Sequence, residues 1–157
     1  MFYYIDGYNF LFHQSESSRP LALQRQTAIH FLQKHFARSH LSGEIVFDGA
    51  HRREEESGRG YQNPLEVVYA PKGQSADAYI IEKIEEMQNP GEATVVTNDR
   101  GLAKQARYAG AHIETNEKFL RRLEKKKTPT EKKKKADTTY QIERLLKIFE
   151  KRLEEEG

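Results

Sequence analysis

Short hydrophobic segments alternate with helical patterns from residue 2 to residue 123, and this alternation restricts the chain to few architectures. The hydrophobic segments show little alternation between apolar and polar residues, which is typical of strands buried on both faces of a parallel sheet. We therefore predict an α/β fold in which one parallel sheet of about five strands is flanked by helices. The expected strands are residues 2–5, 44–47, 65–69, 93–97 and 111–113, and the expected helices are residues 21–36, 75–87, 101–108 and 116–123.

The first expected strand ends at the dipeptide Asp6-Gly7. Both are typical turn residues, because the Asp side chain bonds nearby backbone and Gly tolerates positive φ. We predict a turn at this point and place the first helix after Pro20, a residue suited to a helix start.

The charge of the chain divides it into parts. Residues 1–120 hold 13 basic and 16 acidic side chains, whereas residues 121–135 hold 9 basic and 2 acidic ones. A short basic block of this kind is usually solvated and often binds nucleic acid. The predicted parts are a globular domain over residues 1–123, a Lys-rich linker over 124–136 and an amphipathic C-terminal helix over 137–157.

Several classes of protein are excluded by what the sequence lacks. It has no cysteine, which rules out disulfides and thiolate zinc sites. No apolar run reaches the roughly 18–20 residues needed to cross a bilayer. The start of the chain has neither the basic region nor the apolar stretch of a signal peptide. We therefore expect a cytoplasmic protein with no membrane partner.

Four aspartates occupy comparable places in the predicted fold. Asp6 and Asp48 directly follow strands, Asp99 comes two residues after another strand, and Asp77 lies in the first turn of a helix. The carboxyl ends of parallel strands meet at one edge of a sheet, and ligands of α/β proteins bind at that edge. Taken singly, each aspartate also has a structural explanation in a turn or at a helix start.

Gathered at one edge, these four like charges would repel one another and would need a compensating cation. Carboxylate oxygens prefer hard ions, so Mg²⁺ or Mn²⁺ is the expected cofactor. Such an ion activates water and neutralises charge on phosphate oxygens. The pattern therefore predicts metal-dependent chemistry on phosphate esters.

Four motifs, in this order and at these places, resemble the NYN domains of the PIN-like nuclease superfamily, and most closely their YacP-like branch. The resemblance extends over roughly residues 2–123. It implies a Rossmann-like, PIN-like sheet, bound Mg²⁺ or Mn²⁺, and endonucleolytic cleavage of RNA phosphodiester bonds, including mRNA on the ribosome. The motifs are Asp6-Gly7-Tyr8-Asn9, Phe47-Asp48-Gly49, Ser75-Ala76-Asp77 and Val96-Thr97-Asn98-Asp99-Arg100-Gly101.

The resemblance also implies roles for individual residues. Asp6, Asp77 and Asp99 match the acidic positions that hold the metal and carry catalysis. Asn9 matches the Asn of the first motif, which would orient Asp6 or contact a phosphate of the substrate. Asp48 matches an acid with a less constant role, either a metal ligand or a cap of its own loop.

Substrate contacts are expected around this edge. Asn98 and Arg100 flank the last acid, and Arg100 would either neutralise a phosphate or pair with Asp99. Lys72, just before the helix that carries Asp77, is a further possible phosphate contact.

The loop over residues 50–64 has two interpretations. Its Arg52 and Arg53 would contact phosphate and its Tyr61 would stack on a base, which makes the loop a substrate arm. Its three consecutive glutamates favour the alternative, a solvated loop without a role in binding.

The basic linker is interpreted as an attachment site for rRNA or mRNA, with a solubilising linker as the alternative. The final helix could pair with a second copy, dock on its own domain or dock on a partner, so the oligomeric state stays open. RNA and the ribosome are the expected partners.

Rival functions differ in the motifs that they require. A phospho-acceptor receiver domain would need paired acids after the first strand, and a dinucleotide-binding protein would need a glycine-rich loop; both are absent. A PIN-class toxin stays compatible with the sequence, although the basic tail favours a housekeeping role. The main alternative is a PIN-like module that binds RNA or ribosomes without cutting.

Overall fold

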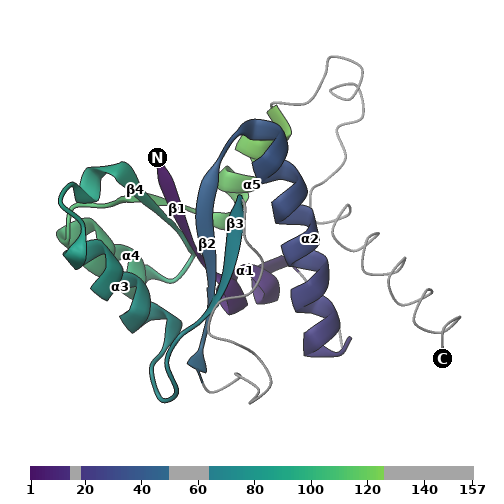
Figure 1. Ribbon diagram of the computed structural model, residues 1–157, viewed down its shortest axis with the longest axis horizontal. Helices are drawn as coiled ribbons and strands as arrows, with labels where there is room; N and C mark the ends of the chain where they lie inside the picture. The colour runs from purple at the N-terminus through teal and green to yellow at the C-terminus, as the bar shows by residue number, and fades with distance from the viewer. Residues whose placement is uncertain (15–18, 50–63, 126–157) are drawn as a thin grey trace, which may run out of the picture.

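One parallel sheet of five strands, in the order β3-β2-β1-β4-β5, forms the centre of the protein in the computed structural model (Figure 1). The structure describes residues 1–14, 19–49 and 64–125. Each pair of neighbouring strands is parallel. The strands are β1 (Phe2–Asp6), β2 (Ser42–Phe47), β3 (Leu65–Tyr69), β4 (Ala93–Val96) and β5 (His112–Glu114).

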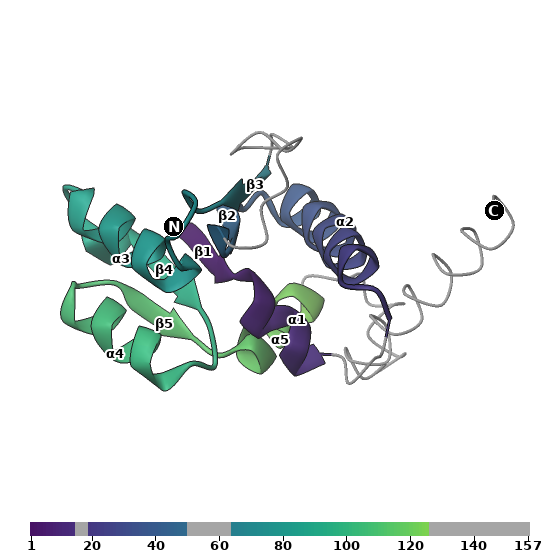
Figure 2. The same ribbon diagram turned by 90° about the horizontal axis from the view of Figure 1, so that it is seen from below.

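Helices cover both faces of this sheet (Figure 2). One hydrophobic cluster joins the sheet to α1, α2 and α5, and a second joins it to α3 and α4. The helices are α1 (Gly7–Gln14), α2 (Leu21–Ser39), α3 (Ala76–Glu86), α4 (Arg100–Tyr108) and α5 (Asn116–Lys125), with a short 3₁₀ helix, η2 (Pro90–Glu92).

The central strand β1 contributes to both clusters. Tyr3 and Ile5 belong to the cluster under α2, whereas Tyr4, between them, belongs to the cluster under α3 and α4. Successive side chains of a strand point to opposite faces, so a strand covered on both sides must be apolar at nearly every position. This double coverage explains why the strands show little polar alternation in the sequence.

The strand register brings the carboxyl ends of the central strands to one edge. Asp6 pairs with Val46 of β2, and Ile5 pairs with Val96, the last residue of β4. Figure 2, drawn from below, looks onto this edge. Residues that follow β1, β2 and β4 therefore begin their loops side by side.

The predicted parallel α/β sheet is confirmed, together with all five strands and the four predicted helices. The turn predicted at Asp6-Gly7 is wrong, because α1 begins at Gly7 directly after β1. A Cβ atom at Gly7 would lie 2.5 Å from Cε1 of Phe47 and 2.8 Å from the carbonyl oxygen of Val46. Glycine is therefore required here for close packing of the helix start against β2.

Two predicted segments lie outside the described residues. They are the loop over residues 50–63, with Arg52, Arg53 and Tyr61, and the C-terminal part over 126–157. Within the described part of the chain, no helix has the length and apolar content needed to span a bilayer.

Candidate metal and catalytic site

Three carboxylates from distant parts of the chain converge at the carboxyl edge of the sheet. Asp6 ends β1, Asp77 lies in the first turn of α3, and Asp99 directly precedes α4. One oxygen from each lies within 4.8 Å of the others. We call these three residues the carboxylate cluster. The structure thus brings together the three acids that match the metal-holding positions of the NYN domains in the resemblance.

Asp6 is the most buried member of the cluster, with 7% of its surface exposed. Burial, the charge of Asp77 and, more weakly, those of Asp48 and Asp99 raise the pKa of Asp6 from 3.8 to about 7. The Thr97 hydroxyl lies 3.1 Å from Oδ2 of Asp6, and this hydrogen bond lowers the pKa in part. A neighbouring cation would therefore strongly stabilise the ionised form of Asp6.

Asp77 is placed by the start of α3. The Ser75 side chain accepts a hydrogen bond from the amide of Ala78 at 3.1 Å, which is the usual capping arrangement at a helix N-terminus. Burial raises the pKa of Asp77, and the charges of Asp99 and Asp48 raise it further. The raised pKa values of Asp6 and Asp77 have the same source, which is negative charge held in a partly desolvated place.

Asp99 caps α4 with one of its two oxygens. Oδ1 accepts hydrogen bonds from the amides of Gly101 at 2.8 Å and Leu102 at 3.2 Å. Its Oδ2 makes no hydrogen bond with the residues that the structure describes. Capping therefore fixes the direction of this side chain and leaves its second oxygen available to a ligand.

Asp48 does not join the carboxylate cluster. Its Oδ1 accepts a hydrogen bond from the amide of Ala76, the first residue of α3, at 2.7 Å. Of the two roles left open by the sequence, this contact supports the structural one, although the cap is on α3 rather than on its own loop. The charge of Asp48 still acts on the cluster electrostatically, since it raises the pKa values of Asp6 and Asp77.

Asn9 joins three separate segments through a single oxygen. Its Oδ1 accepts hydrogen bonds from the amide of Asn98 at 2.8 Å and from Nδ2 of Asn116 at 3.1 Å. The Thr97 hydroxyl lies 3.3 Å from the same oxygen. Asn9 therefore acts on Asp6 indirectly, by fixing the β4–α4 loop whose threonine bonds that carboxylate.

Asn98 is bonded to the start of α5. Oδ1 of Asn98 accepts from the amide of Asn116 at 2.8 Å, and Nδ2 of Asn98 donates to Glu117 at 3.1 Å. Asn98 thus holds α5 at the site, which is a different arrangement from the substrate contact predicted for it.

Asn116 is the residue of this site that the sequence interpretation missed. It is completely buried, and it begins α5 directly after the last strand and its single-residue link. The signal for it is its position, because an Asn at a helix start after a parallel strand falls on the same edge as Asp6 and Asp99.

The structure gives the positions of two of the four basic residues that were predicted to contact phosphate. Arg100 and Lys72 are exposed, and among the described residues neither makes an ion pair. The structure thus shows no pairing of Arg100 with Asp99, and the contact of Arg100 with a phosphate stays a prediction. Arg52 and Arg53 lie outside the described residues.

Comparison with known proteins agrees with this fold. A sequence model of the YacP-like NYN domain matches residues 3–156 of the chain. No curated protein matches the sequence. The fold is similar to crystal structures of Rae1 (YacP) from Bacillus subtilis. One is 18% identical and covers 98% of this chain and 91% of that one, with a TM-score of 0.64. A mutant form is 17% identical and covers 92% and 91%, also with a TM-score of 0.64.

Proposed function

Since the chain belongs to the YacP-like NYN domain family, with a PIN-like, ribonuclease-type fold, we propose that it is a metal-dependent endoribonuclease. Asp6, Asp77 and Asp99 are assigned as metal ligands and catalytic residues. The observation that carries this proposal is the convergence of their oxygens within 4.8 Å.

The donor set fits Mg²⁺ or Mn²⁺. All three ligands are carboxylates, which suits hard divalent ions, and no nitrogen or sulfur donor joins the cluster among the described residues. Burial and mutual repulsion raise the pKa values of Asp6 and Asp77, so the charged forms are disfavoured without a counter-ion. A divalent cation supplies the charge that this arrangement lacks.

When bound, such an ion lowers the pKa of a water molecule and offsets charge on phosphate oxygens. The chain's own residues set the geometry. Asp99 is fixed by capping α4, and Asp77 by the α3 start that Asp48 holds. Thr97, itself an acceptor for the amide of Asp99 at 3.0 Å, orients Asp6.

RNA is the proposed substrate, and mRNA or rRNA on the ribosome in the cytoplasm its proposed setting. The family supports RNA, and the excess of lysine and arginine over residues 121–135 suits a polyanionic partner. Arg100 is the proposed phosphate contact beside Asp99, which is supported by its position as the first residue of α4 and by the lack of an ion pair with the described residues. The other proposed phosphate contacts are Lys72, Arg52 and Arg53.

The second candidate is a non-catalytic module that binds RNA or ribosomes. The convergent carboxylates disfavour it, because they would repel a phosphate backbone that brings no cation with it. Its distinguishing property is RNA binding that is never followed by cleavage.

Cleavage of a labelled, structured RNA in the presence of Mg²⁺ or Mn²⁺ tests the proposal. Asp6→Asn and Asp77→Asn are expected to abolish cleavage, as is a chelator, whereas Asp48→Asn serves as the matched control that removes a charge outside the cluster. Circular dichroism verifies that each variant is folded. Wild-type protein that binds RNA but cuts it neither alone nor on translating ribosomes would support the binding module instead.

A further inference from the structure

The exposed side of α4 carries a row of cations. Arg100, Lys104 and Arg107 are all exposed, and their spacing of four and three residues places them within about 60° of arc on a helix of 3.6 residues per turn. The helix contains no acidic residue. We call these three residues the basic stripe.

The side chains of the basic stripe are available to a ligand. Within the described part of the chain, none of the three takes part in an ion pair or a side-chain hydrogen bond. Other cations behave differently, since Arg122 pairs with Glu114, and Lys83 lies 3.7 Å from Glu86. Arg107 also complements the helix dipole from the last turn of α4, but no ion pair with the described residues holds any of the three side chains away from a ligand.

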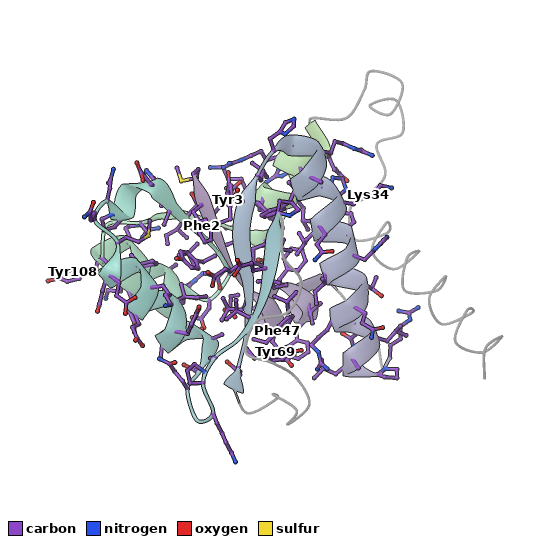
Figure 3. All side chains as sticks on the ribbon, in the orientation of Figure 1. Phe2, Tyr3, Lys34, Phe47, Tyr69 and Tyr108 are labelled. Carbon is purple, nitrogen blue, oxygen red and sulfur yellow. The ribbon has the colours of Figure 1, made fainter. Side chains whose placement is uncertain are left out.

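An aromatic ring stands beside the stripe. Tyr108 has 96% of its surface exposed and follows Lys104 by one helical turn. Figure 3 shows it projecting from the molecule on the side away from α2. A ring this exposed adds nothing to the core, whereas an aromatic face next to cations is the combination that binds single-stranded nucleic acid.

Behind Tyr108, the surface is hollowed between α3 and α4. The hollow has a volume of about 660 Å³. Its apolar lining comes from Ile81, Pro90 and Ala109, while Glu85 on the α3 side is its acidic residue. The hollow thus offers apolar surface suited to a base, and the basic stripe beside it offers positive charge suited to a phosphate.

The stripe is continuous with the carboxylate cluster. Asp99 is the N-cap of α4, and Arg100 is the first residue of the helix. From there the nine residues of α4 rise about 13 Å away from the cluster, at 1.5 Å per residue. A strand whose phosphate lies at the cluster would therefore meet Arg100 first and then the rest of the stripe.

We propose that the exposed face of α4 binds the single-stranded RNA leading away from the carboxylate cluster. Its phosphates contact Arg100, Lys104 and Arg107, and a base stacks on Tyr108 at the mouth of the hollow. This inference rests on the proposed function, because it takes RNA as the substrate. It adds a binding surface outside the cluster, with its own residues and its own readout.

Binding of a fluorescein-labelled, unstructured RNA to the full chain, measured by anisotropy with a chelator present, tests the proposal without requiring cleavage. Tyr108→Ala should weaken binding about tenfold, and Tyr108→Phe, which keeps the ring, should restore it. The double variant Lys104→Ala/Arg107→Ala should weaken binding and reduce the slope of log K against log salt by about 1.4, or about 0.7 for each phosphate that is no longer neutralised.

Lys34 of α2 provides the matched control. Like Lys104, it is an exposed lysine that makes no ion pair among the described residues, and Figure 3 shows it on the opposite side of the molecule from Tyr108. Lys34→Glu should leave RNA binding nearly unchanged, whereas Lys104→Glu should weaken it more than Lys104→Ala. All variants retain the basic C-terminal segment, so RNA binding by that segment is the same in each of them.

Equal reductions in affinity for Lys34→Glu and Lys104→Glu would overturn the proposal, because they would mean a general effect of charge. Wild-type affinity in Tyr108→Ala and in the double variant would also overturn it. So would the absence of RNA binding by wild-type protein, which would leave the stripe to an acidic protein partner. Since cleavage plays no part in this assay, a chain that binds through α4 but never cuts would refute only the proposed nuclease activity.

Discussion

Asp48 and Ala76 are 28 positions apart in the chain, yet Oδ1 of Asp48 accepts a hydrogen bond from the backbone amide of Ala76 at 2.7 Å. The bond ties the end of β2 to the first residue of α3, and the next residue along that helix is Asp77. Asp48 thus positions the helix start that carries Asp77, in addition to the effect of its charge on the carboxylate cluster.

Comparing two substitutions of Asp48 should isolate this bond. Asp48→Asn and Asp48→Ala remove the same charge, but only Asn keeps an oxygen that can accept from Ala76. We expect the free energy of unfolding in urea to be about 1–2 kcal/mol lower for Asp48→Ala than for Asp48→Asn, the usual effect of removing a capping interaction. Equal stability of the two variants would mean that the bond contributes nothing.

Asp6 should make the stability of the metal-free protein depend on pH. Its pKa is about 7 in the folded chain and about 3.8 when unfolded. The folded state therefore keeps its proton over a range in which the unfolded chain has released it. The stabilisation from this proton is complete below pH 4 and disappears as the pH rises through 7.

Asp6→Asn is uncharged at every pH and should lack this dependence. We expect it to be more stable than wild type by roughly 2–4 kcal/mol at pH 8 without metal, and nearly equal to wild type at pH 4. Calorimetric melting at both pH values measures the difference. A constant gap between the two proteins across the pH range would contradict the raised pKa of Asp6.

Divalent cations should offset the loss of stability that ionised Asp6 causes at neutral pH. Adding Mn²⁺ should raise the melting temperature of wild type more at pH 8 than at pH 5, because ion binding requires deprotonated ligands. Asp77→Asn should reduce this increase strongly and Asp48→Asn only slightly. An increase that is the same in all three proteins would place the ion away from the carboxylate cluster.

Asn9→Ala should destabilise the fold more than truncation of a side chain of this size usually does. The substitution removes the common acceptor of the Asn98 amide and Asn116 Nδ2, and it leaves both donors in a partly buried place. We expect the free energy of unfolding in urea to fall by about 1–3 kcal/mol. Cleavage should fall as well, since the loop that holds Thr97 and Asp99 is no longer linked to α1. The variant Ser42→Ala, at an exposed position of β2, is the control for an ordinary truncation.

Gly7→Ala should destabilise the fold by about 1–3 kcal/mol, the usual cost of overpacking. The new methyl group would overlap the Phe47 ring and the carbonyl oxygen of Val46. Gly73→Ala makes a useful contrast. Its Cβ would meet no atom within 4 Å, but its φ is +88°, so its cost comes from the backbone alone. Recovery of Gly7→Ala by the partner substitution Phe47→Leu would identify the overlap as the cause.

The sheet and its acids are predictable from sequence because they depend on local pattern and on topology. Apolar strands such as 93–97 identify a doubly covered sheet, and the rule for parallel strand ends then brings Asp6 and Asp99 to one edge. No knowledge of side-chain contacts is needed for that step. The location of Asp77 follows similarly from the helix start after Gly73.

The features that escape prediction depend on contacts between distant segments. Asp-Gly is a local turn signal, whereas α1 begins at Gly7, whose backbone lies close against the Phe47 ring. The burial of Asn116 and its bond to Asn9 join positions 107 apart, and no local pattern records such a pairing. Likewise, nothing near Asp48 in sequence indicates that its partner is the amide of Ala76.

The hydrogen bonds that converge on Asn9 have a consequence for the growing chain. The strand that carries Asp6 leaves the ribosome first, but the last partner of Asn9 is Asn116. The edge of the sheet cannot close until nearly the whole domain has been translated. In a nascent chain the hydrogen bond between Asn9 and Asn116 therefore forms only after the start of α5 has left the exit tunnel, so this edge of the sheet gains its last support late in synthesis.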